Sequence, residues 1–432
     1  MSGEAAEIRG GRLVFLAMAA AMGGFLFGYD TAVINGGEQQ IQSVWGLSSV
    51  LHGWVMSSAL WGTVIGAFSG GRVTDRLGRK PSLGWSGVFY LVSALWSGLA
   101  FGPWDLMVAR FIGGLAVGVS SIAAPVYIAE IAPADRRGFL GGFFQFNIVV
   151  GMVASQFVNW WLGTAGLGDA TWRWMLGAEA VPALSFTVIC LFLVESPRWL
   201  EMKGLGRRSR STMEGEDSSV HLSSAPTPRF FSRANLRPIL LAFCMAMFNQ
   251  ISGINAMMYF AKRVFEMAGF TPSVALGCAA AMSIVLALAT VAGLFLIDRL
   301  GRRTLLIVGS VGCLVSHFAA ALAFAHGWGT LAAVCIFTFI ASFAIGLGMV
   351  TWVFMAEVFS QRHRATGQSF GSATHWTFCA VLTFVFPAVA VRVAPSSIFS
   401  FFGVCVVFNL LWAVFICPET KGKTLEECAA GA

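Results

Sequence analysis

The feature that most constrains this chain is a set of long stretches that carry almost no charge. Only 11% of the 432 residues are charged and 57% are hydrophobic, whereas soluble domains carry about 25% charged residues. Lipid must therefore replace water around much of the surface. The stretches suit helices that cross about 30 Å of hydrocarbon, and the strands of a barrel would be shorter and alternating. The clearest are residues 13–27, 88–101, 148–158, 274–297 and 398–417.

The distribution of basic residues predicts how the chain crosses the membrane. The first span resembles a signal peptide, but another span follows at once and it carries the polar Tyr29 and Asp30. Of the 28 Lys and Arg, four fall at odd-to-even connections, Arg110 lies within a span, and the remaining 23 lie at the termini and the even-to-odd loops. This predicts a multi-pass protein of the plasma or inner membrane with both termini in the cytoplasm. The predicted spans are 12–34, 49–71, 82–102, 105–129, 139–162, 173–194, 238–261, 272–297, 304–325, 329–358, 367–391 and 396–417.

Three charged signatures occur twice along the chain. "GRVTDRLGRK" at 71–80 returns as "LFLIDRLGRR", "YIAEIAPADRRG" at 127–138 returns as "FMAEVFSQRHRATG", and "VESPRWL" at 194–200 returns as "PETKGKTL". The matching carboxylates stand 223, 227 and 224 residues apart: Asp75 and Asp298, Glu130 and Glu357, Glu195 and Glu419. A near-constant offset predicts two six-helix halves from one ancestral unit, and transporters hold their substrate between such halves at the membrane midplane.

The predicted fold class is therefore all-α, a polytopic membrane protein with twelve transmembrane helices in two pseudo-symmetric six-helix bundles. The connection between the halves is rich in Ser and Arg, so we expect it to be partly disordered, with a short interfacial helix near residues 230–236. The predicted bounds are 1–200 for the first bundle, 201–237 for the cytoplasmic linker, 238–420 for the second bundle and 421–432 for a cytoplasmic tail.

Asp30 stands near the end of an apolar run, where a carboxylate costs roughly 2.5–3.5 kcal/mol on insertion scales. Arg110 is the only cation buried within the first half, so we expect the two to pair. If the arginine moves away during transport, the acid becomes able to take up a proton. The alternative is a static ion pair that only fixes helix packing. Asn255 stands at the equivalent position of the second half.

The repeated motifs resemble those of the sugar porter family of the major facilitator superfamily, and the resemblance covers nearly the whole chain. It rests on "GRVTDRLGRK", "RFIGGLAVG", "YIAEIAPADRRG", "ESPRWL", "NQISGIN" and "PETKGKTLEE" together. The arrangement is most similar to that of bacterial proton-coupled monosaccharide symporters of the xylose/proton type. The linker is shorter than is usual in the family. Four residues within the spans differ from those that relatives often carry: Met152, Phe260, Leu286 and Met349. These differences leave the identity of the substrate open.

The resemblance implies that Asp30 carries the coupling proton, because facilitative relatives have Asn there. It also implies that Glu179, within "WRWMLGAEAVPAL", tunes the Asp30–Arg110 pair. A packing role for Glu179 is the alternative.

Sugars present hydroxyl groups that both donate and accept, with apolar C–H faces between them, so a sugar site needs amides and aromatic rings. The seventh predicted span supplies amides in "FNQISGINAMMYF", where Gly253 permits local unwinding. Position in the family points to Gln145, Gln250, Asn255 and Trp352 as sugar contacts. Further candidates are Phe27, Asn249, His375 and Trp376. For each amide the alternative is a bond between helices, and for each tryptophan a core or belt position.

The repeated charged motifs also predict a gate at the cytoplasmic side. We expect Asp75 to cap a neighbouring helix and the other residues to bridge each half, holding the inner side shut until the transporter switches. Simple positive-inside anchoring explains the basic residues but not the paired acids. The gating candidates are Asp75, Arg76, Arg79, Glu130, Arg137, Glu195 and Arg198 in the first half, and Asp298, Arg299, Arg302, Glu357, Arg364 and Glu419 in the second.

No catalytic residue, metal site or cofactor is predicted. The nine cysteines form no C-x-x-C pair, and the "KGKT" near the end has Cys417 where a phosphate-binding loop needs glycine. We expect a non-enzymatic monomer in a lipid bilayer that carries monosaccharide and protons and binds no nucleic acid. Alternatives are a facilitative uniporter and a sugar sensor that hardly transports. A drug/proton antiporter would not need the row of amides.

Overall fold

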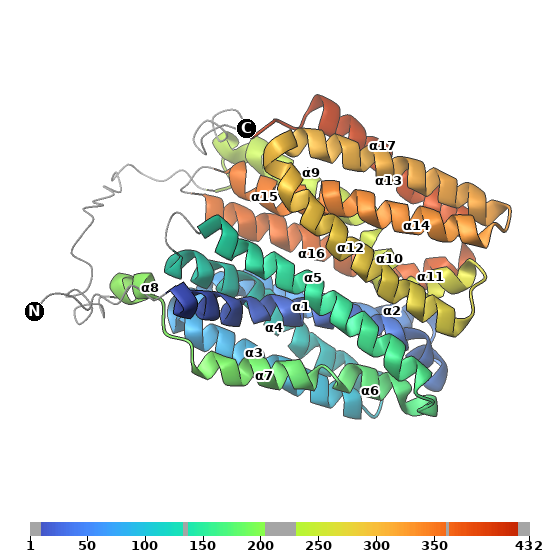
Figure 1. Ribbon diagram of the computed structural model, residues 1–432, viewed down its shortest axis with the longest axis horizontal. Coiled ribbons are helices and arrows are strands. Elements are labelled where there is room, and N and C mark those ends of the chain that lie inside the picture. The colour runs from blue at the N-terminus through green and yellow to red at the C-terminus, as the bar shows by residue number, and fades with distance from the viewer. Residues whose placement is uncertain (1–9, 133–136, 204–229, 360–362, 422–432) are drawn as a thin grey trace, which may run out of the picture.

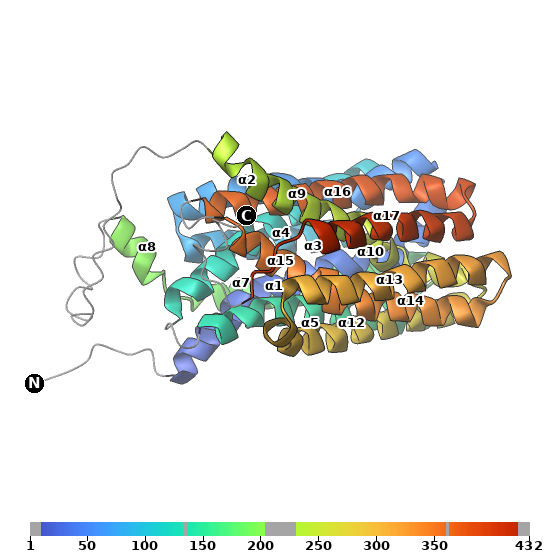
Figure 2. The same ribbon diagram turned by 90° about the horizontal axis from the view of Figure 1, so that it is seen from above.

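The computed structural model describes residues 10–132, 137–203, 230–359 and 363–421. Figures 1 and 2 show long helices that run side by side along one axis, with the first half of the chain below the second half in Figure 1. Because the chain crosses the bundle back and forth, α1 begins and α17 ends at the same end. We call this end the terminal end, and we call the other, where α1 ends and α2 begins, the far end.

The helices of the first half follow the predicted spans, except that α1 continues to Val44, past the predicted end at residue 34, and the sixth span is divided between α6 and α7. α3 carries four buried serines (Ser82, Ser86, Ser93 and Ser97) and is the one predicted span missing from the eleven described helices that are long and apolar enough to cross a membrane. The elements are α1 (Gly10–Val44), α2 (Ser49–Leu77), α3 (Arg79–Leu99), α4 (Pro103–Ile131), α5 (Arg137–Thr164), η1 (Gly168–Ala170), α6 (Thr171–Gly177), α7 (Ala180–Leu191) and α8 (Pro197–Met202).

The second half repeats this plan, with two of its spans interrupted. The helix predicted near 230–236 is reduced to the short turn η4, and residues 204–229 of the predicted linker lie outside the described residues. The elements are η4 (Arg233–Asn235), α9 (Leu236–Ile251), α10 (Ile254–Tyr259), α11 (Ala261–Met267), α12 (Pro272–Leu300), α13 (Arg302–Ala325), α14 (Gly329–Phe343), the π-helical η5 (Ala344–Gly348), α15 (Met349–Glu357), α16 (Arg364–Arg392) and α17 (Pro395–Phe415).

Two equivalent glycines show the repeat in three dimensions. Gly78 separates α2 from α3 with φ 101°, and Gly301 separates α12 from α13 with φ 90°. A side chain is disfavoured at such angles. A Cβ atom would also come within 2.3 Å of Glu195 Oε2 at Gly78 and within 2.6 Å of Glu419 Oε2 at Gly301. Each half therefore needs glycine where a carboxylate approaches the helix start.

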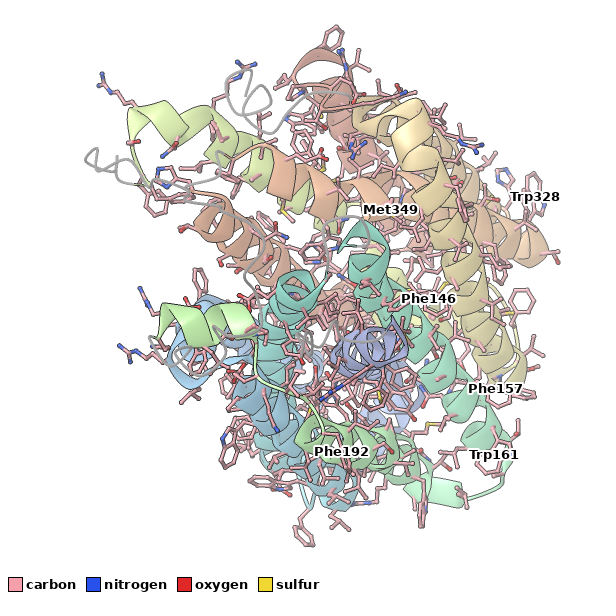
Figure 3. All side chains as sticks on the ribbon, turned by 60° about the vertical axis from the view of Figure 1, so that its left-hand side comes forward. Phe146, Phe157, Trp161, Phe192, Trp328 and Met349 are labelled. Atoms are coloured by element: carbon pink, nitrogen blue, oxygen red, sulfur yellow. The ribbon has the colours of Figure 1, made fainter. Side chains whose placement is uncertain are left out.

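Small residues let neighbouring helices approach within each half. A Cβ atom on Gly62 of α2 would lie 2.2 Å from the carbonyl oxygen of Phe111, and one on Gly66 would lie 2.6 Å from that of Leu115. Glycine at such positions allows α2 and α4 to pack closely. Large apolar side chains instead cover the outside of the bundle: Figure 3 labels Phe157, a residue of α5 that is 58% exposed. An apolar exterior of this kind suits a lipid environment.

The two halves meet closely at the far end. α2 packs on α16 and α5 packs on α12. At Gly53, near the start of α2, a Cβ atom would come within 2.1 Å of the carbonyl oxygen of Phe384 in α16. At Gly163, near the end of α5, it would come within 2.6 Å of Leu276 in α12.

Candidate functional site

The predicted ion pair between Asp30 and Arg110 is present. It joins α1 to α4, and Arg110 Nη1 lies 2.5 Å from Asp30 Oδ1. Arg110 Nη2 also donates to the backbone oxygen of Asp30 at 3.1 Å. Both residues are buried. Because a buried charge is costly without a partner, the pair explains how each ionised group is tolerated here.

Further titratable groups, among them Glu179 and Tyr259, lie close to this pair. Glu179 is buried between α6 and α7 and is close enough to interact electrostatically with both Asp30 and Arg110. Its Oε1 atom has no hydrogen-bond partner among the described residues. Tyr259, in α10 of the second half, is buried close to both residues. The sequence analysis did not select Tyr259, although it is one of only four tyrosines in the chain.

A cavity of about 120 Å³ lies between the two halves. All eight residues that the sequence analysis selected as sugar contacts line it. Phe27 and Gln145 come from the first half and the other six from the second. The remaining lining residues, which the sequence analysis did not select, are Thr31, Ile148, Val149, Met152, Ile254, Met258, Leu286, Thr290, Phe343, Ala344 and Gly348.

The amides on the second-half wall form a connected chain. Asn255 Nδ2 donates to Gln250 Oε1 across the break between α9 and α10. Gln250 Nε2 donates to Asn249 Oδ1 at 2.9 Å and lies 2.9 Å from His375 Nε2. Asn249 Nδ2 in turn donates to the carbonyl oxygen of Leu347 at 3.2 Å. This chain sets the orientation of the Gln250 and Asn255 side chains.

Other polar groups of the cavity are free of such bonds. Within the described residues, the Gln145 amide, the Trp352 indole N–H and the Asn255 Oδ1 atom make no recorded hydrogen bond. Aromatic rings lie beside them. The Phe27 and Trp376 ring centroids are 5.2 Å apart, and Trp352 lies 4.9 Å from His375. The cavity thus combines donors, acceptors and flat apolar faces.

At the terminal end, a charged network ties the helices of the first half together. Arg79 makes two bonds to Glu130, from Nε at 3.0 Å and from Nη2 at 2.9 Å. Glu195 Oε1 accepts from the backbone N–H groups of Arg79 at 2.9 Å and of Lys80 at 3.2 Å. These N–H groups belong to the first turn of α3, where a carboxylate is favoured.

The second half repeats this network. Arg302 binds Glu357 through Nε at 3.2 Å and Nη2 at 2.9 Å. Glu419 accepts from the backbone N–H groups of Arg302 at 2.9 Å and Arg303 at 3.1 Å, in the first turn of α13. Burial alone would raise the pKa of the Glu419 carboxyl, but these and other backbone donors outweigh it, so the pKa lies below its usual range.

The structure corrects one expectation. Asp75 was expected to cap a neighbouring helix, but it is exposed and pairs with Arg79 at 3.2 Å, four residues along the chain. Glu195 is the residue that caps α3. Arg76 and Arg299 are exposed. The side chains of Arg137, Arg198, Asp298 and Arg364 lie outside what the structure describes. Among the described residues, every recorded ion pair at the terminal end lies within one half.

A charged contact between the halves lies at the far end. Glu38 of α1 and Arg263 of α11 make two bonds, from Arg263 Nε and Nη2, both at 2.9 Å. His52 Nε2 lies 3.3 Å from Glu38 Oε2, and both side chains are fully buried. The sequence analysis missed this cluster because it ended the first span at residue 34. Arg263 was one of its four basic residues at odd-to-even connections.

The fold and the cavity between the halves define the class of this protein: an integral multi-pass membrane transporter with the major facilitator fold. The model of the family described as "Sugar (and other) transporter" matches residues 16–431, and the chain belongs to this family.

Several relatives and solved structures are similar over almost their whole length. The glucose transport protein of Synechocystis sp. is 31% identical over 451 residues, covering 96% of each chain. The arabinose-proton symporter of Bacillus subtilis is 31% identical over 437 residues, covering 96% of this chain and 94% of the relative. The xylose transporter XylE of E. coli in an inward-open conformation matches with a TM-score of 0.84 and 29% identity, covering 97% of this chain and 99% of that one.

Proposed function

We propose that this sugar transporter is a proton-coupled monosaccharide symporter that works by alternating access. The observation that carries the proposal is a buried, ion-paired acid, Asp30, on the same helix as Phe27 and Thr31, which line the cavity. Ionisable residues within membrane spans mark proton relays and substrate pathways. The relatives named as arabinose-proton and D-xylose-proton symporters support coupling.

In this proposal the proton binds at Asp30 when Arg110 moves away. Tyr259 of α10 is buried close to the pair, and Asn255 of the same helix lines the cavity. Sugar binding at Asn255 can therefore bias the helix that lies beside the proton site. Glu179 shares this environment and modulates the pair.

The sugar contacts divide into two groups. Gln145, Asn255 and Trp352 offer free polar atoms, and Phe27 and Trp376 offer apolar faces for the sugar ring. Asn249 uses both its Nδ2 and Oδ1 atoms within the protein. We therefore assign Asn249 to orienting Gln250, whose own Nε2 and Oε1 atoms are also bonded within the protein.

The structure corresponds to an inward-facing state in this proposal. The recorded polar bonds between the halves lie at the far end, where Glu38 meets Arg263, and the inward-open xylose transporter is a similar fold. The terminal end is then cytoplasmic, as the excess of basic residues there favours. The same proposal includes a monomeric state and a location in the plasma or inner membrane. It also includes the bundle bounds of 1–200 and 238–420, with the linker between the bundles and the tail after them.

The test is uptake of radiolabelled sugars into proteoliposomes that contain the purified protein. With an inwardly directed pH gradient, at least one of xylose, glucose, galactose or arabinose should accumulate above its external concentration. A protonophore should remove the accumulation but leave exchange of internal for external sugar. Equilibration without accumulation would instead identify a facilitative uniporter, and binding without either flux would identify a sensor.

A further inference from the structure

The polar wall of the cavity depends on a break in one helix. α9 ends at Ile251 and α10 begins at Ile254, with Gly253 between them at φ 89°. Gln250 and Asn255 lie on either side of this break and contact each other through it. In a continuous helix, residues five apart would not face each other in this way.

The break leaves a backbone acceptor without its helical donor. Ser252 is 1% exposed, and no described backbone N–H is recorded as donating to its carbonyl oxygen. The oxygen is bonded instead by the side chain of His317, whose Nε2 lies 3.0 Å away. Because a carbonyl oxygen only accepts, His317 Nε2 must carry the hydrogen.

His317 comes from α13 and does not line the cavity. Its side chain is fully buried, with the rings of Phe339, Phe399 and Phe402 at centroid distances of 4.3, 5.9 and 5.9 Å. Phe402 also blocks any side chain at Gly253, where a Cβ atom would come within 2.7 Å of its ring. Phe402 therefore packs against both the imidazole of His317 and the backbone turn at Gly253 and holds them in place.

We propose that His317 is a positioning residue for the sugar site: it stabilises the α9–α10 break and thereby the placement of Gln250 and Asn255. This inference rests on the proposed sugar site. Without a donor at this position the Ser252 carbonyl would be buried and unsatisfied, which is costly. The segment would then recover the bond by closing the turn towards a continuous helix, and Asn255 would leave its position opposite Gln250.

The experiment compares two substitutions at one position. His317→Leu removes the donor, whereas His317→Gln places an amide nitrogen where Nε2 now lies. Asn409→Leu is the matched control, because Asn409 of α17 donates to Ser310 of α13 at 2.8 Å, a buried bond to the same helix but away from the break. Sugar dissociation constants, thermal unfolding and hydrogen exchange of residues 250–257 are measured for each protein.

We expect His317→Leu to weaken sugar binding tenfold or more and to alter hydrogen exchange at the break. His317→Gln should bind within about twofold of the parent, and Asn409→Leu should lose thermal stability but not affinity. If His317→Leu does not fold, His317→Asn, whose amide stops short of the carbonyl, replaces it with the same expectation. Equal sugar affinity in His317→Leu and the parent overturns the inference, as does equal weakening by all three substitutions. Failure of the parent protein itself to bind any monosaccharide would instead overturn the proposed function.

Discussion

Glu38 and Arg263 join the two halves of the transporter through a two-bonded ion pair, with both N–O distances at 2.9 Å. The Glu38 side chain is fully buried and that of Arg263 is 13% exposed. Arg263 also donates to Gln42 at 2.7 Å, and Gln39 donates to Glu266 at 2.5 Å. In the proposed alternating-access cycle the halves part at this end, so these bonds break in each cycle.

The first prediction is that Glu38→Gln favours the state that is open at the far end. Removing one partner of a buried ion pair leaves the other charge uncompensated, which typically costs about 3–5 kcal/mol. The cost falls on the closed far end, so the ratio of far-end-open to far-end-closed molecules should rise by about tenfold or more. Distances between spin labels on Val50 and Val391, exposed near the far ends of α2 and α16, report this ratio.

Asp105→Asn is the matched control for this prediction. Asp105 is an acid at the same end, but its bonds to Trp96 and to the backbone N–H of Phe101 stay within the first half. Its substitution should leave the distance distribution unchanged. If Glu38→Gln also leaves it unchanged, the pair does not hold the far end closed.

The second prediction concerns pH and Glu419. Backbone N–H groups at the start of α13 hold the pKa of this carboxyl below its usual value of 4.5. A lowered folded-state pKa contributes stability above the unfolded-state value, and this contribution is lost as pH falls through the folded-state value. Glu419→Gln should therefore lower the melting temperature at neutral pH. The difference from the parent should shrink as the pH of a thermal-unfolding series in detergent falls below about 4.5, and a constant difference would contradict it.

The helices were predictable from the sequence because lipid imposes a strong, local pattern. Long uncharged stretches marked the spans, and the repeated acids of "YIAEIAPADRRG" and "VESPRWL" marked the two networks. The Asp30–Arg110 pair was predictable as well, since Asp30 had only one basic candidate within a span of the first half. Elimination sufficed there.

Partners that come from distant helices were not predictable. Glu195 caps α3 only because the end of the sixth predicted span lies beside the end of the second. The spacing of residues along the sequence does not reveal this proximity. Arg79 was selected, but its pairing with Glu130 depends on how α3 and α4 pack. His317 resembles any buried histidine until the break at Gly253 brings a free carbonyl beside it.

The third prediction concerns the amides of the cavity. Gln250→Ala should weaken sugar binding by about 1–3 kcal/mol, because Asn255 loses the acceptor that orients it and buried polar groups are left unpaired. Calorimetric titration with the preferred sugar measures the loss. Asn159→Ala serves as the control: Asn159 is buried in the first half and donates to the Val33 carbonyl at 3.0 Å. It should lose thermal stability but retain affinity, and unchanged affinity in Gln250→Ala would remove that residue from the site.

The last prediction separates proton coupling from sugar binding. Asp30→Asn keeps the size of the side chain and its ability to accept from Arg110, but it cannot exchange a proton near neutral pH. The cavity amides of Asn249, Gln250 and Asn255 lie in the second half and do not bond to Asp30 in the described structure. The variant should therefore bind sugar within a few-fold of the parent and still exchange internal for external sugar across the membrane. It should fail to concentrate sugar in proteoliposomes under an imposed pH gradient. Accumulation that survives in Asp30→Asn would place the coupling proton elsewhere, and Glu179→Gln would then be the next variant to assay, because Glu179 is the other buried carboxyl that interacts with Arg110.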